Sequence, residues 1–127
     1  MEVILLRFHG IGEVTVALDP AENPSTVSKL SNALPFRSVA SRWGDEVYFE
    51  TPVKHAEEKG RVEMEVGEVA YWPRGKAICI FFGATPVSEG DRPKAYSPVN
   101  FVGTVEVGLD LLPKIEDGCR VTVSRGR

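Results

Sequence analysis

Arginine and aromatic residues come together between residues 42 and 48, where their types could support ligand recognition. Arg42 and Trp43 are adjacent, and Tyr48 follows shortly after them. A guanidinium group offers several hydrogen-bond donors and also packs favourably against aromatic faces. We interpret Arg42, Trp43 and Tyr48 as a candidate recognition corner. The alternative interpretation is an arginine that stacks on the tryptophan for packing alone.

More aromatic residues occur in the apolar stretch 67–83. Tyr71 and Trp72 precede a turn, so we expect at least one of these rings to bring its polar atom to water. Phe81 and Phe82 are adjacent in an extended segment and must point to opposite faces. One of the two belongs to the core, and the other is available to line a groove.

Two pairs of glutamates share strand faces, and paired carboxylates can perform acid–base chemistry. Glu63 and Glu65 form one pair, and Glu46 and Glu50 form the other. General acid–base catalysis needs a carboxyl group with a raised pKa in a cleft. Nothing in the sequence pattern indicates burial, so both pairs are expected on solvated faces.

The histidines, cysteines and clustered glycines do not form a recognisable site. His9 and His55 have no second ligand at a metal-binding spacing, so we predict no metal and no other cofactor. The glycines of 10–12 lack the following helix of a phosphate loop. Cys79 and Cys119 lie in separate strand-like runs, which is typical of two buried thiols.

The composition indicates one ordinary globular domain, residues 1–127, with a formal net charge of −3. This charge gives no electrostatic footprint for nucleic acid. No apolar run reaches membrane-spanning length and no signal peptide is recognisable, so we expect a cytoplasmic protein without a membrane partner. The absence of glutamine, together with many charged residues, suggests a thermophilic source.

The arrangement of apolar residues predicts a mainly β protein organised around a hairpin. The runs 69–72 and 77–82 flank Pro73 and Gly75, where proline presets one φ angle and glycine permits the reversal. Both faces of 77–82 are apolar, which predicts a central strand covered on both sides. Further strands are predicted over residues 2–8, 13–18, 36–42, 46–50, 62–66, 100–107 and 119–123.

Residues 23–34 carry the strongest helix signal, with Asn23 as N-cap and Pro24 at the first helical position. We expect a solvated loop over 54–61 and a long surface loop over 84–98, which contains Tyr96. A short helical turn is predicted over 108–115. About eight strands and one capping helix favour a closed or nearly closed antiparallel β-barrel, because closure removes exposed edges.

Three segments resemble the cyclophilins: GEVTVALDPAENPSTVSKL, ICIFFG and FVGTVEVGLDLLPKIEDG. Together with WGDEVYFETPV and AYWPRGKA, they make the chain similar to the small cyclophilin-like proteins of archaea and thermophilic bacteria, a family without a characterised function. The resemblance implies the cyclophilin β-barrel fold. It also implies an arginine that donates to a prolyl peptide, for which Arg37 and Arg42 are both candidates, and a pocket phenylalanine at Phe82 or Phe81. The tryptophan and histidine that cyclophilins place before the late strand are missing, since this position reads KAYSP.

Three functions remain open. The first is a groove that binds a proline-containing peptide or a small molecule, with prolyl isomerase activity weak or absent. The second is a weak prolyl isomerase that uses an arginine, and the third is a small-molecule enzyme with a cleft containing Glu46, Glu50 or Glu65. The aromatic surplus around Trp43, Tyr71 and Trp72 would also suit a homodimer interface. The predicted groove residues are Tyr48, Tyr71, Trp72, Phe81, Phe82 and Tyr96.

Overall fold

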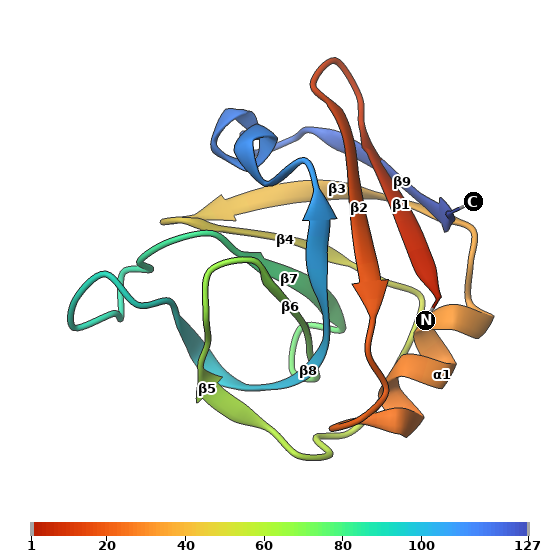
Figure 1. Cartoon of the computed structure of the whole chain (residues 1–127), viewed down its shortest axis with the longest axis horizontal. Coiled ribbons are helices and arrows are strands. Elements are labelled where there is room, and N and C mark those ends of the chain that lie inside the picture. Colours follow the sequence, from red (N-terminus) through yellow and green to blue (C-terminus); the bar gives the residue numbers. More distant parts are fainter. Residues whose placement is uncertain (1, 127) are drawn as a thin grey trace.

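Nine antiparallel strands form one sheet that closes on itself in the computed structural model, which describes residues 2–126 (Figure 1). The strands are β1 Val3–Phe8, β2 Gly12–Leu18, β3 Phe36–Trp43, β4 Glu46–Glu50, β5 Arg61–Glu63, β6 Glu68–Trp72, β7 Ala77–Phe81, β8 Lys94–Val107 and β9 Arg120–Arg125. Their order in the sheet is β2-β1-β9-β3-β4-β7-β6-β8-β5, and β2 also pairs with β8. Eight strands therefore close a ring, and β5 is attached to β8 outside it. The predicted barrel of about eight strands is confirmed.

The strands bury two separate apolar clusters, one on each face of the barrel wall. The larger cluster fills the interior and includes Phe49 from β4 and Ile78 and Ile80 from β7. Because side chains alternate along a strand, Cys79 and Phe81 point to the outer face. There they join a smaller cluster whose other buried members come from β6, β8 and the segment after β5. The prediction that 77–82 is covered on both faces is confirmed, since every residue of β7 is buried.

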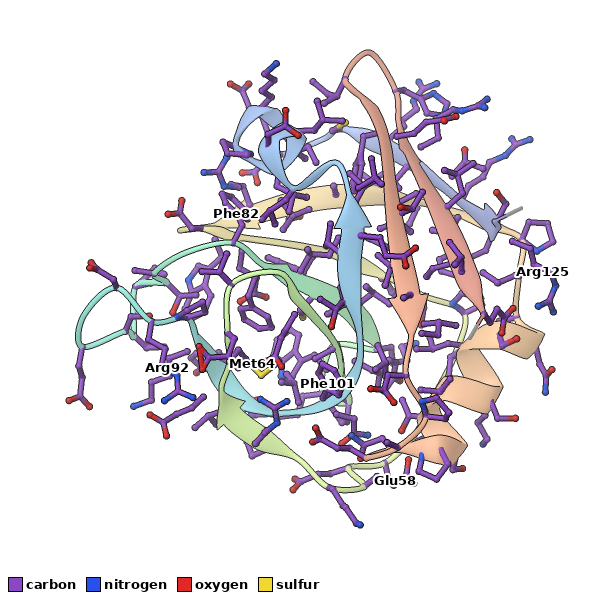
Figure 2. The ribbon with its side chains drawn as sticks, in the orientation of Figure 1. Glu58, Met64, Phe82, Arg92, Phe101 and Arg125 are labelled. Carbon is purple, nitrogen blue, oxygen red and sulfur yellow. The ribbon has the colours of Figure 1, made fainter. Side chains whose placement is uncertain are left out.

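Helix α1 (Pro24–Asn32) lies beside the barrel near the start of β1 and the end of β2 (Figure 1). Asn23 occupies the N-cap position, but its side chain makes no capping bond and instead donates to the carbonyl oxygen of Phe101. The cap comes from Glu58 in the predicted loop 54–61, which lies beside the start of α1 (Figure 2). The Glu58 carboxylate accepts a hydrogen bond from the Thr26 amide at 2.9 Å. A distant loop therefore satisfies the first turn of the helix.

The predicted surface loop 84–98 is wrong from residue 94 onward, where the long strand β8 begins. Pro98, one of three prolines in the segment 84–98, has no amide to donate. It is accommodated because the pairing of β5 with β8 shifts register across this stretch, from Arg61 opposite Val99 to Glu63 opposite Lys94. Tyr96, expected in a loop, is therefore held on a strand.

The predicted strand 62–66 is also only partly correct. β5 ends at Glu63, and the chain then turns, with Gly67 at a φ of +93°. Met64 is fully buried as expected, but Val66 is 53% exposed instead of pointing inward. The alternation of valine and glutamate thus continued past the end of the strand.

The chain after β8 forms the predicted helical turn as a 3₁₀ helix, η1 (Leu109–Lys114). Leu112 and Ile115 are fully buried and close the barrel interior at this end. Within residues 2–126, neither α1 nor η1 is long and apolar enough to span a membrane.

Candidate functional site

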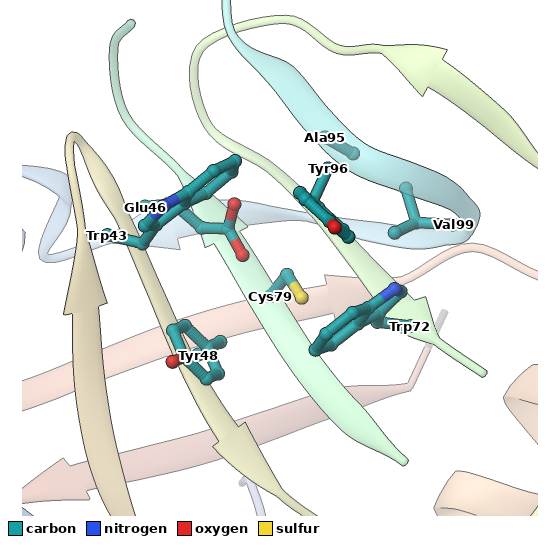
Figure 3. A pocket seen from close by; sticks show the side chains of 8 residues that line it. All are labelled: Trp43, Glu46, Tyr48, Trp72, Cys79, Ala95, Tyr96 and Val99. Carbon is teal, nitrogen blue, oxygen red and sulfur yellow. The ribbon is translucent and has the colours of Figure 1, made fainter. Parts of the chain in front are cut away.

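A pocket of about 220 Å³ opens on the outer face of the barrel wall (Figure 3). Four of its lining residues are aromatic and one is acidic. Strands β3, β4, β6, β7 and β8 all contribute to it. We call it the aromatic pocket; its lining residues are Trp43, Glu46, Tyr48, Trp72, Cys79, Ala95, Tyr96 and Val99.

Strand register brings the pocket residues together. Trp43 lies opposite Glu46 in the β3–β4 hairpin, and Tyr48 lies opposite Cys79 where β4 pairs with β7. Val47 and Phe49 face the barrel interior, so the alternate side chains of β4 must face outward. The first half of β8 runs over this outer face and contributes the remaining wall.

The aromatic rings meet at near right angles. The Trp43 and Tyr96 rings are 6.0 Å apart with an interplanar angle of 79°, and the Trp72 and Tyr96 rings are 6.4 Å apart at 81°. The Tyr48 and Trp72 rings are 6.5 Å apart at 84°. Edge-to-face pairs of this kind are mutually stabilising. Figure 3 shows the four rings arranged around the Glu46 carboxyl group and the Cys79 sulfur atom.

The Trp72 ring is held in place from two sides. Its Nε1 donates to Ser97 Oγ at 2.7 Å, which ties the end of β6 to β8. A Cβ atom at Gly75 would lie 2.4 Å from the indole, so only glycine fits beneath the ring. The sequence assigned Gly75 to the reversal of the hairpin, but the residue with positive φ is Lys76, at 51°. The lack of a side chain at Gly75 therefore leaves room for the Trp72 ring.

Glu46 is buried in the aromatic pocket, with 6% of its surface exposed. Burial raises the pKa of its carboxyl group to about 7, and a hydrogen bond with the Cys79 thiol lowers it in part. The prediction of a solvated face is wrong for Glu46, because Trp43 and the first half of β8 cover it. It is correct for Glu50 and Glu65, whose side chains are 67% and 62% exposed.

Cys79 is 1% exposed, and burial raises the pKa of its thiol well above the ordinary value. The nearby Glu46 carboxylate acts in the same direction. A thiol in this state is a poor nucleophile, because the thiolate is the reactive form. Both cysteines are free, Cys79 buried as expected and Cys119 only half-buried.

Arg42 does not line the aromatic pocket, because its guanidinium group is engaged with the backbone on the neighbouring side. Nε donates to the carbonyl oxygen of Gly44 at 2.7 Å, and Nη1 donates to those of Pro113 and Ile115 at 3.1 and 3.0 Å. Nη2 lies 3.3 Å from Asp45 Oδ1. Arg42 therefore joins the β3–β4 hairpin to the segment around η1.

The other predicted site residues are dispersed. Arg37 is exposed on β3 and lines a different, shallower hollow beside the β1–β2 turn. Phe82 packs beneath Arg42, with the guanidinium carbon 4.9 Å from the ring centroid. Tyr71 is fully buried in the barrel interior, where its hydroxyl donates to the carbonyl oxygen of Val53 at 2.6 Å. Phe81 is fully buried in the outer cluster. Of the six predicted groove residues, Tyr48, Trp72 and Tyr96 line the aromatic pocket.

The sequence named Glu46 only as one of three candidate acids, with Glu50 and Glu65, and did not indicate that Glu46 alone is buried. The available signal was its place next to the Trp43–Asp45 turn, which pairs it with a tryptophan. That position indicates a buried acid only if another element covers the outer face of β4. The covering element is the first half of β8, and the sequence predicts a loop there. Within residues 2–126 there is no cluster of three His, Cys, Asp or Glu side chains suited to a metal ion.

Comparison with known proteins agrees with this architecture. The chain matches the family model described as cyclophilin-like over residues 2–124. It is 40% identical to a hypothetical protein of Archaeoglobus fulgidus whose solution structure is known, with a TM-score of 0.83, covering 98% of this chain and 95% of the other. A search of curated proteins found no match. The extent of the family match shows that this chain belongs to the cyclophilin-like family.

Proposed function

We propose that this protein binds a small ligand, or a short part of a proline-containing peptide, in the aromatic pocket, with prolyl isomerase activity weak or absent. The observation that carries the proposal is the pocket itself: four aromatic side chains from four strands surround one buried carboxyl group. Small-molecule sites are concave and mostly apolar, with a few polar groups that fix orientation. The Trp72 ring is fixed by its hydrogen bond to Ser97 and by its packing against Gly75. A pocket wall that is already in place before the ligand binds is typical of a preorganised site.

The engagement of Arg42 argues against strong isomerase activity. A guanidinium group has five N–H donors, and Arg42 directs four hydrogen bonds to Gly44, Pro113, Ile115 and Asp45. Catalysis by an arginine would require free N–H donors that already point toward the twisted prolyl amide of the bound peptide. Arg37 is exposed in another hollow and is no better placed for an amide in the aromatic pocket.

The proposal is tested by NMR with the protein and a set of X-Pro peptides and small neutral organic molecules. We expect at least one probe to shift the indole signals of Trp43 and Trp72, without faster cis–trans exchange of the peptides. Arg42→Ala should lower stability by about 2 kcal/mol, since it leaves three backbone carbonyls without a charged donor, and it should leave binding intact. Accelerated exchange that disappears in Arg42→Ala would establish an isomerase instead. Indole signals that no probe shifts would argue against a binding pocket.

A second candidate, a small-molecule enzyme that uses Glu46 as general acid or base, is favoured by one specific observation. A carboxyl group whose pKa lies near 7 exchanges protons readily at neutral pH. The test is deuterium incorporation from D₂O into a bound ligand, followed by NMR. Incorporation with the wild-type protein that is lost in Glu46→Gln would support this function, and equal incorporation in both would exclude it.

A further inference from the structure

The arrangement of rings in the aromatic pocket suits a compact, positively charged group. Trp43 and Trp72 each stand at nearly 90° to Tyr96, with centroids 6.0 and 6.4 Å from it. The perpendicular rings do not stack on one another, and all three line the aromatic pocket around the Glu46 carboxyl group. A cation is attracted to an aromatic face within about 6 Å of its centroid. A group held beside Glu46 therefore has aromatic side chains as its neighbours on more than one side.

The charge of the pocket points the same way. Glu46 is its one acidic lining residue, and no lysine, arginine or histidine lies among the eight lining residues. The other titratable groups around it are Cys79 from β7, Tyr48 from β4 and Tyr96 from β8, and neither a thiol nor a phenol can carry a positive charge. Asp45, next to Glu46, is already paired with Arg42 outside the pocket. Among the described residues that line the pocket, none can supply a counter-ion to the buried carboxylate.

We infer that the aromatic pocket binds an organic cation with a methylated ammonium head group, with Glu46 as its counter-ion. This inference rests on the proposed ligand-binding function and specifies the class of ligand. The ligand would supply the positive charge that Glu46 lacks, and its methyl groups would contact the rings of Trp43, Trp72 and Tyr96.

The hydrogen-bonding groups of the pocket favour a methylated head group over a bare ammonium. An unsubstituted ammonium group has three N–H donors that need acceptors once buried. The aromatic pocket offers one buried acceptor group, the Glu46 carboxyl, and the Trp72 indole is a donor already bound to Ser97. A quaternary ammonium has no N–H group to satisfy. The volume of about 220 Å³ is below that of pockets for drug-sized molecules, so a head group fits better than a large ligand.

Burial of Glu46 links cation binding to pH. With a pKa near 7, the carboxyl group of the empty pocket is mostly protonated at pH 6 and mostly ionised at pH 8. A cation binds the ionised form, so binding must release a proton wherever Glu46 is protonated beforehand. The affinity for a cation should therefore rise about tenfold from pH 6 to pH 8.

The test compares two probes of nearly the same shape, choline and its uncharged analogue 3,3-dimethylbutan-1-ol, by tryptophan fluorescence and calorimetry of the full chain. We expect choline to bind at least tenfold more tightly than the alcohol at pH 8 and to lose about tenfold in affinity at pH 6. Glu46→Gln should abolish the preference for choline, while Glu50→Gln, which changes an exposed carboxylate on the same strand face, should retain it. If Glu46→Gln does not fold, the pH dependence and the two-probe comparison on the wild-type protein decide.

The outcomes separate this inference from the proposed function. Equal binding of the two probes, or binding of neutral probes alone, would overturn the cation inference and leave ligand binding in the aromatic pocket intact. A preference for choline that does not change with pH or with Glu46→Gln would overturn the role of Glu46 as counter-ion. Failure of choline, the alcohol, the X-Pro peptides and the other neutral probes to perturb either tryptophan would overturn both proposals.

Discussion

At the scale of single residues, chemical type and structural role differ for the two most suggestive side chains. Arg42 has the donors of a recognition residue, yet it directs them to backbone carbonyls of the segment around η1. Glu46 looks like a solvated strand residue, yet it is 6% exposed beneath aromatic rings. In both cases the environment, and not the residue type, decides the role.

The burial of Glu46 should make folding stability depend on pH. Its carboxyl pKa is about 7 in the folded protein against an ordinary value of 4.5, so the folded state holds the proton more tightly than the unfolded state. The contribution to stability is fully present below pH 4.5 and is lost as pH rises through 7. The loss amounts to roughly 3 kcal/mol. Glu46→Gln does not titrate and should gain this amount relative to wild type between pH 4.5 and pH 8.

Guanidinium unfolding of both proteins at several pH values measures this difference. Glu50→Gln is the matched control, because Glu50 lies on the same strand face with an exposed side chain. Wild type and Glu46→Gln curves that run parallel across this pH range would show that Glu46 is not destabilised by burial.

At the scale of elements, local patterns predicted most strands and failed where a partner element was needed. The β6–β7 hairpin and the β1–β2 hairpin follow from alternation and turn residues alone. β8 was missed from residue 94 to 99, since Pro98 breaks the local signal and only pairing with β5 keeps the chain extended. Because this stretch covers Glu46, the same error hid the burial of Glu46, which the sequence predicts on a solvated face. The aromatic residues Trp43, Tyr48 and Trp72 were predicted because their type alone marks them.

The cap of α1 is an element-scale interaction that the sequence does not reveal. Burial acts to raise the pKa of Glu58, but hydrogen bonds from the Thr26 hydroxyl and amide outweigh it and lower the pKa. The stabilisation is therefore present above pH 4.5 and is lost as pH falls through the lower pKa of the folded state. Glu58→Ala should cost about 1 kcal/mol at pH 7, and the difference from wild type should shrink toward pH 3.

Thermal unfolding of wild type, Glu58→Ala and Glu57→Ala at pH 7 and pH 3 checks this prediction. Glu57 is the exposed neighbour in the same loop and serves as control. If the two variants lose the same stability at pH 7, the loop contributes through its composition and not through the cap of α1.

At the scale of the whole molecule, the barrel closes where β2 pairs with β8, and the two backbones approach closely at Gly103. β2 and β8 close the ring, with Leu18 opposite Gly103. A Cβ atom at Gly103 would lie 2.3 Å from the carbonyl oxygen of Ala17. This contact is with backbone, so it cannot be relieved by rotating a side chain, and closure requires glycine at this position.

Gly103→Ala should therefore force β2 and β8 apart and lower stability by about 3 kcal/mol, at the upper end of the cost of overpacking. Hydrogen exchange should accelerate most at the amides of β2 and the second half of β8, because these lose their pairing before the rest of the sheet. Gly90→Ala is the control, since a Cβ atom there has no neighbour within 4 Å. A Gly103→Ala protein as stable as Gly90→Ala, with unchanged exchange in β2, would mean that the ring tolerates an opening at this seam. Closure would then contribute less to the fold than the pairing of neighbouring hairpins.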